Sequence, residues 1–156
     1  MNIIINNHNK IANKADTMDQ PERFWKSVES EEIMLLATAS KDNVSMRTVS
    51  PVRYDDAVLI FTGPGSRKYA QLKENPNCCF SLTGCFVEAK AEFFGPTMAD
   101  GNEKLREAYD KKFKGAFDEK LAFNGRDSEF ILLRPIVIKG WNMENGMFTS
   151  PFEYKF

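Results

Sequence analysis

The sequence predicts a mainly β domain of the α+β class, a six-stranded antiparallel barrel with two or three flanking helices. Two observations favour this fold. Most apolar or alternating runs are short and are separated by turn residues, which is typical of strands joined by tight turns. A few other segments have the apolar spacing and the end signals of helices. With 156 residues, 42% of them apolar and 12% aromatic, the chain has enough material for one packed core.

We expect a single globular domain over residues 18–150. Residues 1–17 are rich in asparagine and have no hydrophobic period, so we expect a poorly ordered N-terminal tail to which no function is assigned. Residues 151–156 are expected to form a C-terminal tail. No internal repeat or low-complexity segment interrupts this order.

The first helix is predicted in the stretch "DQPERFWKSVES". Asp19 and Glu22 have the spacing of a capping box, and a proline is tolerated in a first helical turn. Phe24, Trp25 and Val28 fall on one side, so this helix should cover one end of the sheet.

Residues 33–62 contain three apolar or alternating runs, broken at Lys41–Asn43 and at Asp55–Asp56, which is the pattern of an antiparallel meander. Pro51 inside the second run predicts an edge, a bulge or a strand end. Three more strands are predicted at "CCFSLT", "FVEAKAEFFG" and "EFILLRPIVIKGW", and "GMFTS" could add a short one. The stretch "GNEKLREAYDKKFKGAF" has one apolar stripe at helical spacing and should pack on the barrel.

A short helix is predicted within Gly63–Pro76, "GPGSRKYAQLKENP", with Ser66 as its N-cap and the proline at its end. Arg67 and Lys68 stand in its first turn, where the helix dipole disfavours cations. Two interpretations remain open. The free amides, the hydroxyl and the two cations suit a phosphate, but lysine and arginine are also ordinary on a solvated helix end.

Two other residues are candidates for a binding site. Arg47 lies in "SMRTVSPV", where it could pair with a nearby carboxylate. Alternatively, it could join Ser66, Arg67 and Lys68 around one dianion, if the second strand lies beside the loop after the third, as in a meander. Trp141 follows "PIVIKG", and an aromatic residue near a strand end is more typical of packing than of a cofactor contact.

Composition and charge exclude several classes of function. With 21 basic and 22 acidic residues, the net charge of −1 argues against binding nucleic acid through a broad basic face. No apolar run is long enough to cross a bilayer and no signal peptide is seen, so we expect a cytoplasmic protein with no membrane partner. Cys78, Cys79 and Cys85 are expected to be reduced, and with His8 as the only histidine no metal site is expected.

One long stretch resembles a known family. Residues 47–82, "RTVSPVRYDDAVLIFTGPGSRKYAQLKENPNCCFSL", followed by "AKAEFFG" and "PIVIKGW", resemble the FMN-binding split-barrel proteins related to pyridoxamine 5'-phosphate oxidase, especially their short general-stress-protein branch. The resemblance covers about residues 20–142. Its most specific part is the arginine on the second strand together with "SRKYAQLKENP" after the third. It implies a split barrel that forms a homodimer with FMN at the subunit interface.

The resemblance also implies the residues that contact the cofactor. Arg47 and Lys68 would hold the FMN phosphate with help from two neighbours, and the backbone after Arg47 would run along the flavin ring. Phe61 and Thr62 would correspond to the family's aromatic and threonine pair beneath the cofactor, and Trp141 would reach the flavin bound mainly by the partner subunit. The full set is Arg47, Thr48, Val49, Ser50, Phe61, Thr62, Ser66, Arg67, Lys68 and Trp141.

The departures from the family imply that the chain is not a true pyridoxamine 5'-phosphate oxidase. Val52 stands where the oxidase has a lysine that binds the substrate phosphate, although Arg53 is adjacent. The oxidase has an arginine and a histidine just after its late tryptophan, whereas here no basic residue follows until Lys155. A glutamine that the oxidase places near the flavin falls around Gly84.

We therefore expect an FMN-dependent oxidoreductase, related to stress or redox chemistry, that exchanges electrons with a small-molecule donor and acceptor. No side chain stands out as an acid, a base or a nucleophile, so no catalytic residue is assigned; in flavin enzymes the ring carries the electrons. The alternatives are a non-catalytic flavin-binding or redox-sensing protein, and a split barrel that binds a deazaflavin or haem. The sequence identifies neither the physiological substrate nor the role of the cysteines.

Overall fold

The computed structural model describes residues 19–156. The N-terminal tail predicted at residues 1–17, with His8, lies outside the described residues. The helices of the described part are α1 (Gln20–Ser30), α2 (Arg67–Glu74) and α3 (Glu103–Lys112). Its strands are β1 (Met34–Ser40), β2 (Asn43–Val49), β3 (Val52–Tyr54), β4 (Ala57–Thr62), β5 (Asn77–Leu82), β6 (Cys85–Pro96), β7 (Glu129–Glu144) and β8 (Met147–Lys155).

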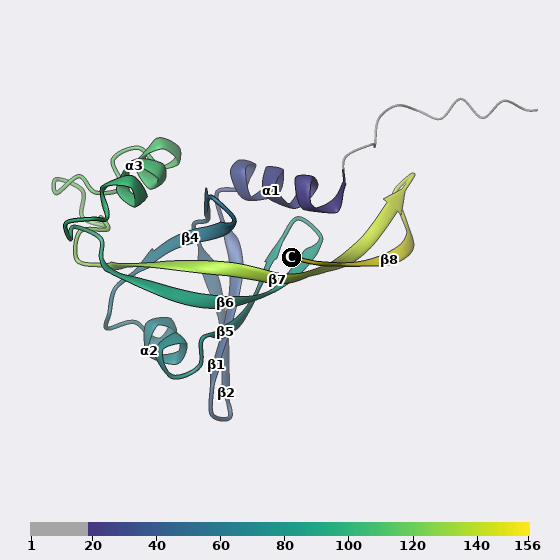
Figure 1. The fold of residues 1–156 in the computed structure, drawn as a ribbon, viewed down its shortest axis with the longest axis horizontal. Coiled ribbons are helices and arrows are strands. Elements are labelled where there is room, and N and C mark those ends of the chain that lie inside the picture. The colour runs from purple at the N-terminus through teal and green to yellow at the C-terminus, as the bar shows by residue number, and fades with distance from the viewer. Residues whose placement is uncertain (1–18) are drawn as a thin grey trace, which may run out of the picture.

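All the paired strands are antiparallel and form one curved sheet in the order β2-β1-β5-β6-β7-β4-β3, with β8 added to β7 (Figure 1). The predicted mainly β, antiparallel fold with flanking helices is confirmed. Eight strands are found between residues 19 and 156, rather than six, for two reasons. The second predicted run divides at Pro51 into β2 and β3, and β7 turns back at Asn145 and Gly146 into β8. Residues 151–155, expected in a C-terminal tail, belong to β8.

The meander expected over residues 33–62 is instead two hairpins. β2 pairs with β1 and β3 pairs with β4, and these hairpins lie at the two ends of the sheet order. The strand end predicted at Pro51 is confirmed, because that residue lies between β2 and β3. The strand that carries Arg47 is therefore not the ladder neighbour of the strand that leads into α2. The two approach each other because α2 packs against β1.

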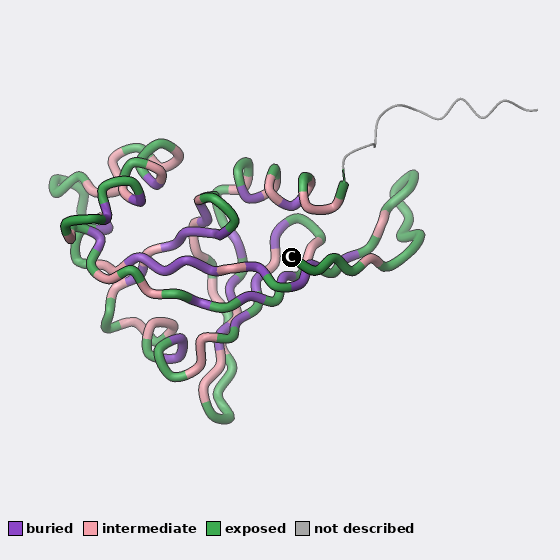
Figure 2. The backbone as a smooth tube through the Cα atoms, viewed as in Figure 1, coloured by how far each residue is buried: buried purple, intermediate pink, exposed green. Residues whose placement is uncertain are grey.

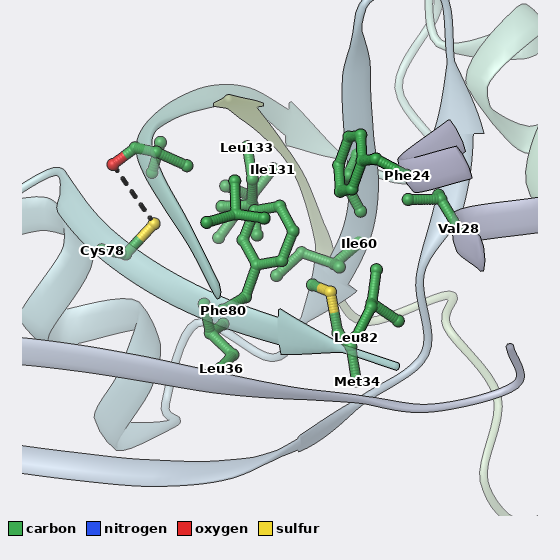
Figure 3. Packing of buried hydrophobic residues seen from close by; sticks show 14 of the residues in the cluster. Phe24, Val28, Met34, Leu36, Ile60, Cys78, Phe80, Leu82, Ile131 and Leu133 are labelled. Carbon is green, nitrogen blue, oxygen red and sulfur yellow. Dashed lines mark hydrogen bonds between the residues drawn. The ribbon is translucent and has the colours of Figure 1, made fainter. Parts of the chain in front are cut away.

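The main core fills the concave side of the sheet. Phe24 and Val28 of α1 are fully buried there against strand residues such as Leu36, Ile60 and Phe80 (Figure 3). Figure 2 shows how burial runs along the central strands and declines toward the β7–β8 hairpin and the β1–β2 turn. The predicted position of α1 over the sheet is therefore confirmed, and the side chain of Asp19 caps it by accepting from the amide of Glu22 at 2.9 Å.

A second cluster lies between α3 and the other face of β3, β4 and β7. Leu105 and Tyr109 of α3 are buried there against Leu59 and Phe130. Because β4 and β7 also bury residues such as Ile60 in the main core, both strands are covered on both faces. This explains why their sequences are nearly continuous apolar runs rather than alternating ones.

The hydroxyl of Tyr109 and the ammonium group of Lys112 fasten α3 to the strand break at Pro51. Tyr109 donates to the carbonyl of Ser50 at 3.0 Å. Lys112 donates to the carbonyls of Val28, Glu31 and Pro51 at 2.8, 2.6 and 2.7 Å. Together these bonds join α1, α3 and the end of β2. Among the residues that the structure describes, no helix is both long and apolar enough to span a membrane.

Candidate functional site

The helix α2 begins as the sequence predicts. Ser66 is its N-cap, and its hydroxyl accepts from the amide of Tyr69 at 3.3 Å and lies 2.9 Å from the hydroxyl of Thr62. The amide of Ala70 bonds to the carbonyl of Ser66 at 3.2 Å. Of the amides at the start of the helix, those of Arg67 and Lys68 have no intrahelical acceptor, as at the beginning of any α-helix.

The guanidinium of Arg47 points toward α2 from the neighbouring hairpin. Its Nη1 donates to the carbonyl of Leu36 at 3.3 Å and to the hydroxyl of Thr38 at 2.6 Å. Its Nη2 donates to the hydroxyl of Ser45 and to Oε1 of Gln71, the latter at 3.2 Å. Four of its five N–H groups are therefore engaged, all with uncharged acceptors.

Gln71 is the centre of this network and was not identified from the sequence. It is 4% exposed, and its Oε1 accepts from the hydroxyls of Thr38 and Ser45, each at 2.7 Å. Its Nε2 donates to the carbonyl of Asn43 at 3.0 Å. The two hydroxyls thus accept from Arg47 and donate to Gln71, and the amide orients the whole set. The signal in the sequence was a polar residue on the buried side of a short amphipathic helix.

The positive charges of Arg47, Arg67 and Lys68 affect one another. Burial lowers the pKa of Arg47, and the charge of Arg67 lowers it further. Burial also lowers the pKa of Lys68, with the charge of Arg47 as the second cause. Over residues 19–156 no ion pair joins any of the three to a carboxylate. The nearby carboxylate of Glu129 accepts from the hydroxyl of Tyr69 at 2.9 Å.

This arrangement fits a dianion such as the phosphate of FMN. Cations that raise one another's electrostatic energy are unfavourable until an anion neutralises them, and the first amides of α2 add donors that point the same way. The side chains of Lys68 and Arg67 make no hydrogen bond to other described residues, so they are the free donors. Arg47 brings its charge and its remaining N–H group. Thr62 and Ser66 form the hydroxyl pair beside the helix start.

The segment predicted to run along a flavin ring, Arg47 to Ser50, ends β2. Thr48 is exposed on the convex face of the sheet, while Val49 packs on the main core and Ser50 bonds through its carbonyl to Tyr109. The position of this segment is therefore fixed by α3 as well as by β1.

Phe61 and Thr62 point in opposite directions, as neighbours on a strand do. The ring of Phe61 packs in the α3 cluster, with its centroid 4.7 Å from that of Tyr109. The hydroxyl of Thr62 is the one that turns toward Ser66. Of this predicted pair, the structure brings Thr62 to the start of α2 and turns the ring of Phe61 away from it.

Trp141 lies in the part of β7 that pairs with β8, and three strands separate β7 from β2 in the sheet. Its side chain is 53% exposed and contacts Phe148, with ring centroids 6.1 Å apart. Trp141 therefore fulfils only in part the packing role that the sequence also allowed, because about half of the residue stays exposed. Within one chain the structure does not bring Trp141 to the cations of α2.

Two of the residues that depart from the oxidase pattern, Val52 and Arg53, lie next to each other on β3. Val52 is buried against the α3 cluster. Arg53 leaves the opposite face of β3, pairs with Glu29 at 2.8 Å and lies over the ring of Trp25 at 4.9 Å from its centroid. Neither side chain is directed toward the start of α2.

The three cysteines are free thiols. Cys78 is buried, donates to the carbonyl of Ala89 at 3.6 Å (Figure 3), and has a pKa raised to about 12 by its burial. Cys79 is exposed, so the adjacent pair faces opposite sides of β5. Within residues 19–156 no group of three or more metal-ligating side chains is found.

These features can be compared with known proteins. The family model described as "Pyridoxamine 5'-phosphate oxidase" matches residues 21–135, which is more than half of the chain. The chain belongs to the pyridoxamine 5'-phosphate oxidase family. The resemblance seen in the sequence is confirmed, and the curved antiparallel sheet is the split barrel of this family. No curated protein sequence gives a significant match.

Solved structures share the fold at low sequence identity. A FAD-binding protein from Mesorhizobium loti has a TM-score of 0.62 and 14% identity, covering 78% of this chain and 92% of that one. The General Stress Protein 26 of Bacillus anthracis strain Sterne has a TM-score of 0.60 and 15% identity, covering 84% and 94%. An F420 reductase has a TM-score of 0.58 and 18% identity, covering 72% and 93%. These similarities define the fold.

Proposed function

We propose that this chain binds FMN and acts as a flavin oxidoreductase, with the FMN phosphate at the start of α2. The observation that carries the proposal is that Arg67 and Lys68 both lie close enough to Arg47 for their charges to act on one another, while none of the three has a carboxylate partner between residues 19 and 156. Family membership agrees with it, since a FAD-binding protein has the same fold. When bound, the flavin supplies the electron-transfer chemistry.

The contacts within the chain indicate a different role in phosphate binding for each of these residues. Lys68 and Arg67 would donate directly, because their charged groups are not engaged by other described residues. Arg47 would act mainly through its charge, since four of its N–H groups hold β1, β2 and α2 together. Ser66 would fix the helix start by accepting from the amide of Tyr69, and its O–H, which also lies within reach of Thr62, would remain able to donate to the phosphate.

The ring of the flavin would lie along the end of β2, against the backbone of Arg47, Thr48, Val49 and Ser50. The bonds from α3 favour this placement, because Tyr109 and Lys112 hold the carbonyls of Ser50 and Pro51 in fixed positions. Thr62 lies near the start of α2 and would contact the cofactor between ring and phosphate, whereas Phe61 would only support that strand from the α3 side.

A homodimer would complete the site. Large apolar side chains stand on the convex face of the sheet, where solvent would otherwise cover them: Leu35, Val44, Met46 and Phe86 are 42 to 73% exposed. An exposed apolar patch of this kind is typical of an interface. Because Trp141 is exposed and does not approach the cations of its own chain, it would serve the flavin of the partner. Light scattering with and without FMN tests this, since a monomer with full FMN occupancy would contradict it.

Two further candidates share the fold. A deazaflavin is favoured by the similarity to an F420 reductase. A non-catalytic flavin-binding or redox-sensing protein is the other, since no catalytic acid or base is assigned among the described residues and the nearby carboxylate of Glu129 is engaged by the hydroxyl of Tyr69. Haem has less support, because the only histidine of the chain is His8.

One experiment separates these candidates. The protein is purified and denatured, and the released small molecule is identified by mass and absorption spectrum. We expect FMN, and a deazaflavin or haem would contradict the cofactor. The FMN-loaded protein is then mixed with one reduced nicotinamide donor under anaerobic conditions. Bleaching of the flavin absorption, followed by its return in air over many cycles, indicates an oxidoreductase. Bound FMN that no donor reduces would favour the sensing protein.

A further inference from the structure

The carboxylate of Glu129 borders the start of α2. Glu129 is the first residue of β7 and the ladder partner of Thr62 at the end of β4. Directly opposite residues of an antiparallel pair share one face of the sheet, and the hydroxyl of Thr62 lies 2.9 Å from that of Ser66, the N-cap of α2. In Figure 1 α2 follows β4 on the side of the molecule where β7 begins. The side chain of Glu129 is therefore at the edge of the proposed phosphate site.

The hydroxyl of Tyr69 holds this carboxylate. It donates to Oε2 of Glu129 at 2.9 Å. The ring of Tyr69 is itself fixed, because the ring of Phe93 meets it edge to face at 5.2 Å and Nζ of Lys73 lies 5.2 Å from its centroid. Tyr69 directly follows Lys68 on α2. The bond that restrains the carboxylate thus comes from the residue next to a cation of the site.

The negative charge of Glu129 and the positive charge of Lys68 are close in the fold but separate. Among the residues that the structure describes, no ion pair joins Glu129 to Lys68 or to Arg67. Glu129 and Lys68 are both half-buried, whereas Arg67 is exposed, and half-buried charges are less screened by solvent. A phosphate at the start of α2 would therefore be attracted by Lys68 and repelled by Glu129. A carboxylate released from Tyr69 would pair with Lys68 and neutralise it.

We propose that Glu129 limits the affinity of the site for a phosphate, and that Tyr69 is a positioning residue that keeps this carboxylate from pairing with Lys68. The inference deepens the proposed function and rests on it in one respect, namely that the phosphate is the one carried by FMN. Because both effects act on the phosphate, they should change the affinity for FMN and not that for riboflavin.

The first test compares FMN with riboflavin in three variants, by fluorescence titration of each flavin with the cofactor-free protein. Glu129→Gln removes a repelling charge and should strengthen FMN binding about threefold. Tyr69→Phe releases the carboxylate and should weaken FMN binding about fivefold, the size of one partly exposed charged contact. In the double variant, FMN affinity should equal that of Glu129→Gln, because no carboxylate remains to be released. Riboflavin affinity should stay within about twofold throughout.

Two substitutions serve as matched controls. Tyr54→Phe removes the hydroxyl of another half-buried tyrosine, which packs on the α3 cluster. Glu74→Gln removes another carboxylate of α2, which pairs with Lys41 at 3.9 Å. Neither control should change the ratio of the FMN and riboflavin affinities. A loss of FMN affinity in Tyr69→Phe that persists beside Glu129→Gln, or that riboflavin shares, would assign Tyr69 a packing role and overturn the proposal.

The second test does not use FMN. The pKa of Lys68 is followed by NMR in the cofactor-free protein with isotope-labelled lysine, and Lys68→Arg identifies the signal. Because an ion pair favours the charged form of a lysine, Tyr69→Phe should raise the pKa of Lys68. Adding Glu129→Gln should abolish that rise. A pKa of Lys68 that Tyr69→Phe leaves unchanged would overturn the proposal.

The two proposals can fail separately. Equal affinity of the unmodified protein for FMN and riboflavin would remove the phosphate site, while the pKa of Lys68 would still show whether Tyr69 restrains Glu129. A preference for FMN that none of these variants changes, with a constant pKa of Lys68, would keep the flavin function and remove the roles of Tyr69 and Glu129.

Discussion

Oε1 of Gln71 lies 3.2 Å from Nη2 of Arg47, although the two residues are 24 positions apart. The contact joins α2 to the β1–β2 hairpin, and Thr38 and Ser45 complete it. The guanidinium of Arg47 is thereby held near Lys68 by neutral groups. Because none of these groups is a carboxylate, none of them neutralises its positive charge. The position of the phosphate site depends on this amide.

Replacing Gln71 by leucine should therefore destabilise the protein. The substitution leaves the buried hydroxyl of Thr38 and the half-buried hydroxyl of Ser45 without their acceptor and removes one of the two acceptors of Nη2 of Arg47, which costs about 1–3 kcal/mol. Urea unfolding of the FMN-free protein measures the loss. Gln20→Ala, which removes a partly exposed bond to Asn142, is the control and should cost no more than about 0.5 kcal/mol. A Gln71 variant as stable as this control would show that the network is not a structural centre.

The role of Lys68 is tested against another lysine of the same helix. Lys68→Ala should weaken FMN binding by about one to two powers of ten, because a charge-assisted hydrogen bond contributes about 1.5–3 kcal/mol. Lys73, in the last turn, lies 3.9 Å from the ring centroid of Phe93, so Lys73→Ala should leave FMN affinity within about twofold. Isothermal titration with FMN gives both values. An equal loss of FMN affinity in the two variants would show that the net positive charge of α2, rather than a specific contact with Lys68, determines binding.

The pH dependence follows from the lowered pKa of Lys68. As pH rises through that pKa, Lys68 loses its charge, so FMN affinity should fall. At pH values well below that pKa the full contribution of this charge to FMN affinity should be present. The stability of the FMN-free protein should change in the opposite direction. Because the folded-state pKa lies below the ordinary value of 10.5, the folded state releases its proton first and gains stability between the two values.

The measurement is a series of FMN titrations from neutral pH to about pH 10, just below the ordinary pKa of lysine. Lys68→Arg is the control, since an arginine keeps its charge over this range. Its FMN affinity should not change with pH. A decline of the same size in the arginine variant would assign the titration to another group.

The local features of the fold could be predicted from the sequence because short-range chemistry determines them. Asp19 and Ser66 cap the helices where their side-chain oxygens predict it, and Pro51 ends β2 because it cannot donate to a ladder. The order of the strands could not be predicted, because it depends on pairings between distant segments such as β4 and β7. β8 is longer than the short strand predicted at "GMFTS", although Asn145 and Gly146 are a strong hairpin signal.

The site was predictable in part. Arg67 and Lys68 stand out because cations at a helix start are unfavourable without an anion. Gln71 was missed, because a polar residue on the buried side of a short helix is a weak signal and its partners Thr38 and Ser45 lie on another hairpin. The direction of Phe61 also depended on tertiary structure, since only the position of α3 shows that β4 is buried on both faces.

The FMN-loaded protein should not oxidise pyridoxamine or pyridoxine phosphate at a measurable rate. Val52, at the position of the oxidase lysine, is 4% exposed in the α3 cluster. Arg53 is held on the opposite face by Glu29, so it does not replace that lysine. The missing charge-assisted contacts, at about 1.5–3 kcal/mol each, leave the substrate phosphate weakly bound. An oxygen-consumption assay checks this, and steady turnover that Arg53→Ala abolishes would contradict it.

The comparison of FMN with riboflavin tests the central claim most directly, because the two ligands share the ring and the ribityl chain and differ only in the phosphate. Flavin fluorescence is titrated with the cofactor-free protein for each ligand under identical conditions. If Lys68, Arg67 and the start of α2 hold the phosphate, FMN should bind at least about tenfold more tightly than riboflavin, the effect of one charge-assisted contact. Equal affinities would contradict the phosphate site.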